Sequence, residues 1–202
     1  MKPEEIEKTS FAIIDEEAGS HDFSAEEWSI VRRIIHTSAD FEYKETVRFH
    51  PLAIKNGVNA IRSGKTIITD TEMAKVGIRK RDLTSFGNNL TCLISDPEVM
   101  NISSKNGITR AAAAVDAALP FIDGSVYVIG NAPTALLRLI ELITDGSAKP
   151  ALVVGFPVGF VNASESKWQL TDTDYPFISN KGRKGGSNVA ASVVNALIEL
   201  SV

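Results

Sequence analysis

Hydrophobic and polar residues follow two alternating patterns along the chain. Short runs dominated by apolar residues are typical of strands buried on both faces in a parallel sheet, and they lie at residues 65–70, 90–95, 125–130, 151–157 and 176–179. Between and after these runs, apolar residues recur at the spacing of a helix, at residues 51–62, 109–119, 135–144 and 187–200. We therefore predict an α/β fold, a three-layer α/β/α sandwich with a mostly parallel central sheet. No repeat, low-complexity tract or linker interrupts the pattern, so residues 1–202 are predicted to form a single domain.

A further helix is predicted to begin after Ser24. Ser24 and Glu27 have the spacing of a capping box, in which each side chain satisfies a free backbone donor of the other residue. Trp28, Val31 and Ile35 then recur at helical spacing and form an apolar stripe that we expect to face the core.

The composition of the chain excludes several kinds of site and several classes of binding partner. The single cysteine, Cys92, excludes an intrachain disulfide and a cysteine-rich zinc site. His21, His36 and His50 show no metal-ligand spacing, so no metal is expected. A net charge of -4 argues against a nucleic-acid or acidic-membrane partner. Apolar runs stay below about 18 residues, which predicts no membrane span, and the charged start without a signal core leads us to expect a cytoplasmic protein.

Two glycine-containing turns are candidate anion sites, because ligands bind beyond the carboxyl ends of parallel strands. GNAPTAL at residues 130–136 follows a predicted strand and opens a helix, so free N–H groups near Gly130 and Asn131 favour an anion. GRKGGS at residues 182–187 adds two cations, with Gly186 for backbone freedom and Ser187 as the expected N-cap. The backbone conformations of tight turns also require glycine, and this explanation accounts for both glycine patterns as well as anion binding does.

Other catalytic signatures are missing or imperfect. The chain has no GxGxxG, GKT at 64–66 lacks the earlier glycine of a phosphate loop, and GFPVG at 155–159 has proline where a nucleophile elbow needs serine. Arg33 and His36 are neighbours on one helix face, which suits a polyanionic ligand together with proton transfer. A partly buried histidine near a helix C-terminus is the plainer interpretation. Arg110 opens an alanine-rich helix, where it is either a ligand-binding cation or a solvated surface residue.

Taken together, these stretches resemble the precorrin-8X methylmutase family, including its cobalt-precorrin-8 form. GNAPTAL and the PVGFV…ESK pattern of residues 157–167 are the specific matches. They are joined by SFAII at 10–14, RIIH at 33–36, TRAAA at 109–113 and the glycines at 182, 185 and 186. The resemblance extends from near residue 6 to the last helix.

The resemblance implies a homodimeric isomerase of cobalamin biosynthesis. Such an enzyme moves a methyl group from C-11 to C-12 of precorrin-8X or cobalt-precorrin-8, giving hydrogenobyrinate or cobyrinate, and uses no cofactor. It implies His36 as the catalytic acid/base and Ser10, Arg33 and Arg110 as substrate-binding residues. Phe156, Val158 and Phe160 are then expected to face the macrocycle. The alternatives are a Rossmann-like enzyme acting on a phosphorylated or nucleotide substrate, and a non-catalytic tetrapyrrole-binding module.

Overall fold

The sheet at the centre of the molecule carries the site region. The computed structural model describes residues 3–202, and its sheet has the strand order β1-β6-β5-β4-β2-β3. The strands are β1 Val47–Phe49, β2 Ile67–Thr69, β3 Leu90–Cys92, β4 Val126–Ile129, β5 Leu152–Gly155 and β6 Phe177–Asn180. All neighbouring pairs are parallel except β1 and β6, in which Val47 lies opposite Asn180. The predicted three-layer, mostly parallel architecture is therefore confirmed.

Helices cover both faces of the sheet, because successive strand side chains point to opposite sides. Val128 and Val154 point into one core, and Tyr127 and Val153 point into the other. The first core is covered by α4 (Ala53–Arg62), α5 (Glu72–Gly77), α6 (Lys80–Leu83) and α11 (Ser187–Leu200). The second is covered by α8 (Arg110–Ile122), α9 (Pro133–Thr144) and α10 (Ala163–Thr171), with α7 (Pro97–Asn106) packed outside α8.

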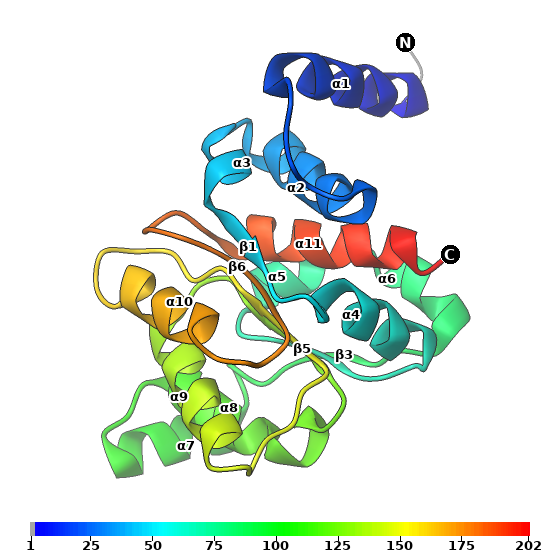
Figure 1. Ribbon diagram of the computed structural model, residues 1–202. Helices are drawn as coiled ribbons and strands as arrows, with labels where there is room; N and C mark the ends of the chain where they lie inside the picture. Colours follow the sequence, from blue (N-terminus) through cyan, green and yellow to red (C-terminus); the bar gives the residue numbers. More distant parts are fainter. Residues whose placement is uncertain (1–2) are drawn as a thin grey trace.

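The N-terminal helices extend the first face outward. Figure 1 shows α11 against the sheet, α2 (Ala25–Ser38) above α11, and α1 (Pro3–Ala18) above α2. The predicted capping box of Ser24 and Glu27 is present in full. Ala39 ends α2 in a left-handed conformation with φ 53°, and α3 (Glu42–Thr46) leads from there into β1. Within the described residues, none of the helices is both long and apolar enough to cross a membrane.

Candidate active site

His36 lies in the last turn of α2, where its side chain is exposed. The ring of Phe11 on α1 meets the imidazole edge to face, with 5.1 Å between ring centroids. His36 and Ser10 line one cavity of about 430 Å³, whose walls also include Ile35 and Phe41. The structure therefore brings together two of the predicted site residues, contributed by different helices.

Arg33 is one turn from His36 but points elsewhere. It is 9% exposed, and its guanidinium bridges Glu7 of α1 at 3.0 Å and Glu199 of α11 at 2.6 Å. The same Glu199 oxygen binds Arg79 at 2.6 Å. The carboxylate-binding capacity expected of Arg33 is thus occupied by two carboxylates of the chain itself.

The turn before α9 holds an internal anion, which differs from the free anion site predicted there. Asp70 follows β2, and its carboxylate accepts hydrogen bonds from the N–H groups of Gly130, Asn131 and Ala132 at 2.9, 2.8 and 2.9 Å. Burial raises the pKa of Asp70, while these donors act in the opposite direction. The backbone of the turn is therefore satisfied, and the exposed Asn131 side chain is what remains for a ligand.

Besides donating its N–H to Asp70, Gly130 permits close packing. A Cβ at this position would lie 2.6 Å from the Cα of Ser187, so only glycine lets β4 approach the start of α11 this closely. Asp70 is the last residue of the strand predicted at residues 65–70, and it was not among the predicted site residues. The available signal was an aspartate at the end of one predicted strand and a glycine turn at the end of another, and the sheet places these two strands, β2 and β4, side by side.

The turn at residues 182–187 also differs from the prediction in its backbone bonding. The N–H of Gly186 donates to the carbonyl of Phe156 at 2.9 Å, so it is not free for a substrate carboxylate. Gly186, with φ 128°, is itself the N-cap of α11. The hydroxyl of Ser187, predicted to be the cap, instead shares a 2.8 Å hydrogen bond with that of Thr71.

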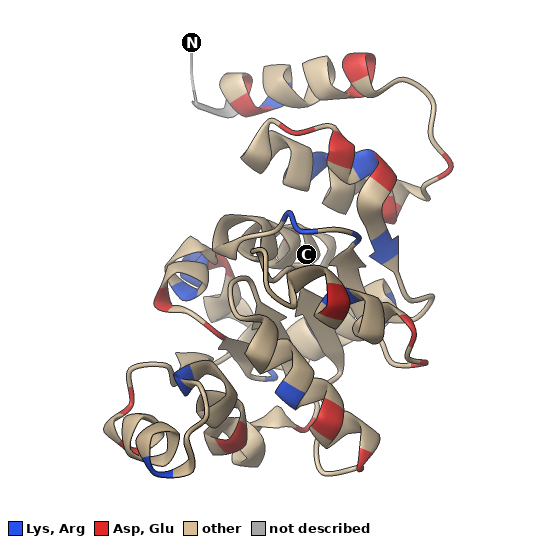
Figure 2. Ribbon diagram, turned by 90° about the vertical axis from the view of Figure 1, so that its left-hand side faces the viewer, with Lys and Arg blue, Asp and Glu red and all other residues tan. Residues whose placement is uncertain are grey.

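The two cations of this turn have different environments. Lys184 Nζ binds Asp40 at 2.5 Å and Glu42 at 2.8 Å, and its hydrogen bond lowers the pKa of Asp40. These pairs tie the turn to the segment just after His36. Arg183 has no carboxylate partner among the described residues and lies over the ring of Phe160, 5.6 Å from its centroid. Figure 2 shows this basic loop below α2.

Lys167 fixes the same turn from inside. It is 1% exposed, and its ammonium donates to Asn180 Oδ1 at 3.1 Å and to the carbonyl of Lys184 at 2.5 Å. Burial lowers the pKa of Lys167 to about 8. In the sequence, Lys167 stands out only as part of the PVGFV…ESK pattern. Its burial was not predicted, because a buried lysine inside a polar helix gives no periodic signal.

Arg110 is a second cation of the region without an ion-pair partner among the described residues. It opens α8, is exposed, and makes no ion pair or hydrogen bond among the described residues. The cap of its helix, Thr109, shares a 2.8 Å hydrogen bond with Thr134 of α9, which places Arg110 near the Asn131 turn. Val158 and Phe160 are exposed, whereas Phe156, also expected to face the macrocycle, is fully buried in the core and cannot face a ligand.

These contacts link the loops at the carboxyl edge of the sheet into one region. The region contains an exposed imidazole and a serine hydroxyl. It also contains amide and arginine side chains that are free to bind anions, and apolar side chains that are exposed. Such a surface suits a ligand that has both carboxylates and a large apolar body. Within residues 3–202, no cluster of three or more His, Cys, Asp or Glu side chains is arranged to hold a metal ion.

Known proteins resemble this chain over nearly its whole length. The sequence profile of the precorrin-8X methylmutase family matches residues 5–200. The cobalt-precorrin-8 methylmutase of Priestia megaterium is 48% identical over 197 residues, covering 98% of this chain and 88% of that protein. A precorrin-8X methylmutase of Sinorhizobium sp. is 39% identical, covering 95% and 92%. The crystal structure of precorrin-8X methylmutase from Thermus thermophilus superposes with a TM-score of 0.91 at 46% identity, covering 98% and 96%.

Proposed function

Because the chain belongs to the precorrin-8X methylmutase family, we propose that His36 is the proton donor of its reaction and that the edge described above holds its corrin precursor. The chain is an isomerase of cobalamin biosynthesis that moves a methyl group from C-11 to C-12 of its substrate. This activity replaces the nucleotide-enzyme and carrier alternatives.

The observation that carries the proposal is the cavity shared by Ser10 and His36. An exposed imidazole is free to meet a substrate atom, and the Phe11 ring restricts its orientation. Protonation makes the conjugated macrocycle electron-poor. The methyl group then leaves C-11 with its bonding electron pair and forms the new bond at C-12. The proton returns to His36 when the conjugated product is released.

Substrate carboxylates are assigned to side chains rather than to backbone. Arg110, Asn131 and Arg183 are exposed and have no carboxylate partner among the described residues. Gly130, Gly186 and Ser187 then shape the two turns that present Asn131 and Arg183, while Arg110 is presented by the start of α8.

We further propose that the enzyme is a homodimer whose site is completed by a second copy. The cavity beside His36, about 430 Å³, is at the low end for a small ligand. Large apolar side chains lie exposed near the loop at residues 182–187, namely Phe160 at 86%, Val161 at 77% and Trp168 at 66%. Light scattering at assay concentration should give a dimer, and an active monomer would refute this arrangement.

We propose cobalt-precorrin-8 as the substrate and the cytoplasm as the location. The cobalt-precorrin-8 methylmutase of Priestia megaterium is 48% identical to this chain, against 39% for the precorrin-8X methylmutase of Sinorhizobium sp. and 46% for the solved precorrin-8X methylmutase of Thermus thermophilus. Any cobalt arrives inside the substrate. The test is mass-balanced turnover of metal-free and cobalt-loaded precursor, followed by carbon NMR of the migrating methyl. Faster turnover of the cobalt-loaded form supports the assignment, and absence of turnover with both precursors contradicts the proposed function.

A further inference from the structure

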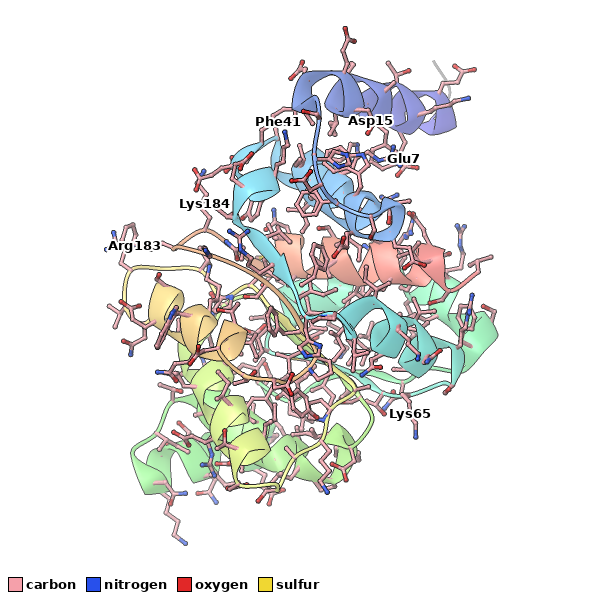
Figure 3. All side chains as sticks on the ribbon, in the orientation of Figure 1. Glu7, Asp15, Phe41, Lys65, Arg183 and Lys184 are labelled. Atoms are coloured by element: carbon pink, nitrogen blue, oxygen red, sulfur yellow. The ribbon has the colours of Figure 1, made fainter. Side chains whose placement is uncertain are left out.

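Helix α1 is the outermost element, and α2 is its main support. Figure 1 shows it lying across α2, away from the sheet. Ile14 and Ala18 are its buried apolar side chains, whereas Ile6 and Ile13 are about half exposed. Acidic side chains supply much of the remaining attachment: Glu7 binds Arg33, and Asp15 binds Arg32 at 2.8 Å and Trp28 Nε1 at 2.8 Å. Figure 3 shows Glu7 and Asp15 directed from α1 toward α2.

The two carboxylates on Arg33 are not equivalent. Glu199 lies on α11 and is shared by Arg33 and Arg79, so its position is fixed by two guanidinium groups. Glu7 pairs with Arg33 alone among the described cations, although the side chains of Glu7 and Glu199 are equally exposed, at 45%. An incoming carboxylate can therefore replace Glu7 without changing the charge balance around Arg33, and the freed Glu7 returns to water at little cost.

We propose that Glu7 is a displaceable stand-in for a substrate carboxylate on Arg33, so that corrin binding frees the start of α1 to move. This inference rests on the proposed function, because it requires a polycarboxylate ligand. On this proposal, Glu7 lowers the affinity of the resting enzyme for substrate. The site opens only when a substrate carboxylate occupies Arg33.

The position of α1 controls the space beside His36. One cavity of about 420 Å³ is lined by Glu7, Phe11 and Arg32, and the cavity of about 430 Å³ containing Ser10 and His36 also borders α1. Phe11 contributes to the wall on one side and meets His36 on the other. Movement of α1 away from α2 would join the two spaces, giving a macrocycle the room that neither cavity offers alone.

The test compares Glu7→Gln with the wild type and with Asp15→Asn. Glu7→Gln keeps the size of the side chain and a hydrogen-bond acceptor but removes the competing charge. Asp15→Asn makes the same change on the same helix without touching Arg33. Affinity is measured by absorbance titration with cobyrinate, the product of the cobalt form. We expect Glu7→Gln to bind cobyrinate about two- to fivefold more tightly, the worth of a partly exposed ion pair, and Asp15→Asn to differ from the wild type by less than that.

A double-mutant cycle separates competition from a general loosening of α1. In an Arg33→Gln background, verified as folded by circular dichroism, Glu7→Gln should no longer change cobyrinate affinity, because the shared partner is gone. Hydrogen exchange tests the movement: the amides of residues 5–9 should exchange faster in wild-type protein when cobyrinate is bound.

The outcomes separate a failure of the proposed function from a failure of the proposed role of Glu7. If cobyrinate binds neither wild type nor variant and the precursor is not turned over, the proposed function fails. If the wild type binds and turns over substrate but Glu7→Gln shows equal or weaker affinity, the proposal for Glu7 is overturned and the function stands. Unchanged or slower exchange at residues 5–9 overturns the movement of α1.

Discussion

The internal anion Asp70 permits a quantitative prediction about stability. Asp70→Asn preserves shape but replaces one carboxylate oxygen with an NH₂ group. In the wild type one oxygen accepts from Gly130, and the other accepts from Asn131 and Ala132. The amide oxygen is expected to keep the side with two donors, so the NH₂ group faces the buried N–H of Gly130.

The expected loss follows from these bonds. The Gly130 N–H is left without an acceptor, at about 1–3 kcal/mol for a buried donor. The two remaining bonds lose their charge assistance and become roughly half as strong. Relief of the carboxylate's desolvation offsets part of this loss. We expect the free energy of unfolding to fall by about 2–4 kcal/mol, a large share of the total of about 5–15 kcal/mol typical of a domain.

Urea unfolding followed by tryptophan fluorescence measures this loss. With an m-value of about 2–3 kcal/mol/M, the midpoint should fall by about 1–2 M. Asp123→Asn is the matched control, because exposed Asp123 accepts one N–H bond, from Lys149 at 3.0 Å, which an amide oxygen can keep. Its free energy of unfolding should change by less than about 0.5 kcal/mol. Equal midpoints for Asp70→Asn and the control would refute the account of the turn.

Three further predictions concern catalysis, titration and packing. His36→Ala should keep its fold, since the side chain is exposed, and lose about 10²–10⁴-fold in turnover; near-normal turnover of cobalt-precorrin-8 would remove His36 from the mechanism. Burial lowers the pKa of Lys167 to about 8 from 10.5, so the unfolded state binds more protons between those values and stability gains with rising pH. Urea unfolding at pH 7.5 and 9.5 should show this gain in wild type but not in Lys167→Met, and parallel pH trends would contradict it. Gly130→Ala places a Cβ 2.6 Å from Ser187 and should cost about 1–3 kcal/mol, which thermal unfolding detects; an unchanged Tm would show that the backbone relaxes.

The sequence predicted those elements whose signals are local. The capping box at Ser24 fixes the start of α2, and the helix predicted from residue 109 begins one residue later because Thr109 is its N-cap. Runs dominated by apolar residues predicted β2 to β6, because strands buried on both faces have no polar side; β2, β4, β5 and β6 are buried throughout, and β3, at the edge of the sheet, is half-buried. β1 was missed because Val47–Phe49 is short and has a half-buried arginine at its centre.

The helices missed in sequence analysis have weaker periodicity. α1 places Ile6 and Ile13 toward solvent, which blurs its apolar stripe, and α10 is mostly polar. α7 was detectable, since Asp96 caps a helix whose first residue is Pro97. At the site, the glycine turns were located correctly but their hydrogen-bond partners were not. Asp70 reaches Gly130 across 60 residues of sequence, and spacing within a single turn carries no information about such a partner.

The antiparallel pairing of β1 with β6 determines when the N-terminal part of the chain can fold. Val47 pairs with Asn180, and α2 packs against α11. During synthesis, the face of α2 that packs against α11 stays uncovered until the last helix leaves the ribosome. Closure of this layer therefore depends on contacts of very high sequence separation, which form slowly and leave apolar surface exposed meanwhile. A nascent chain released before residue 187 would lack α11, against which α2, the helix that carries His36, packs.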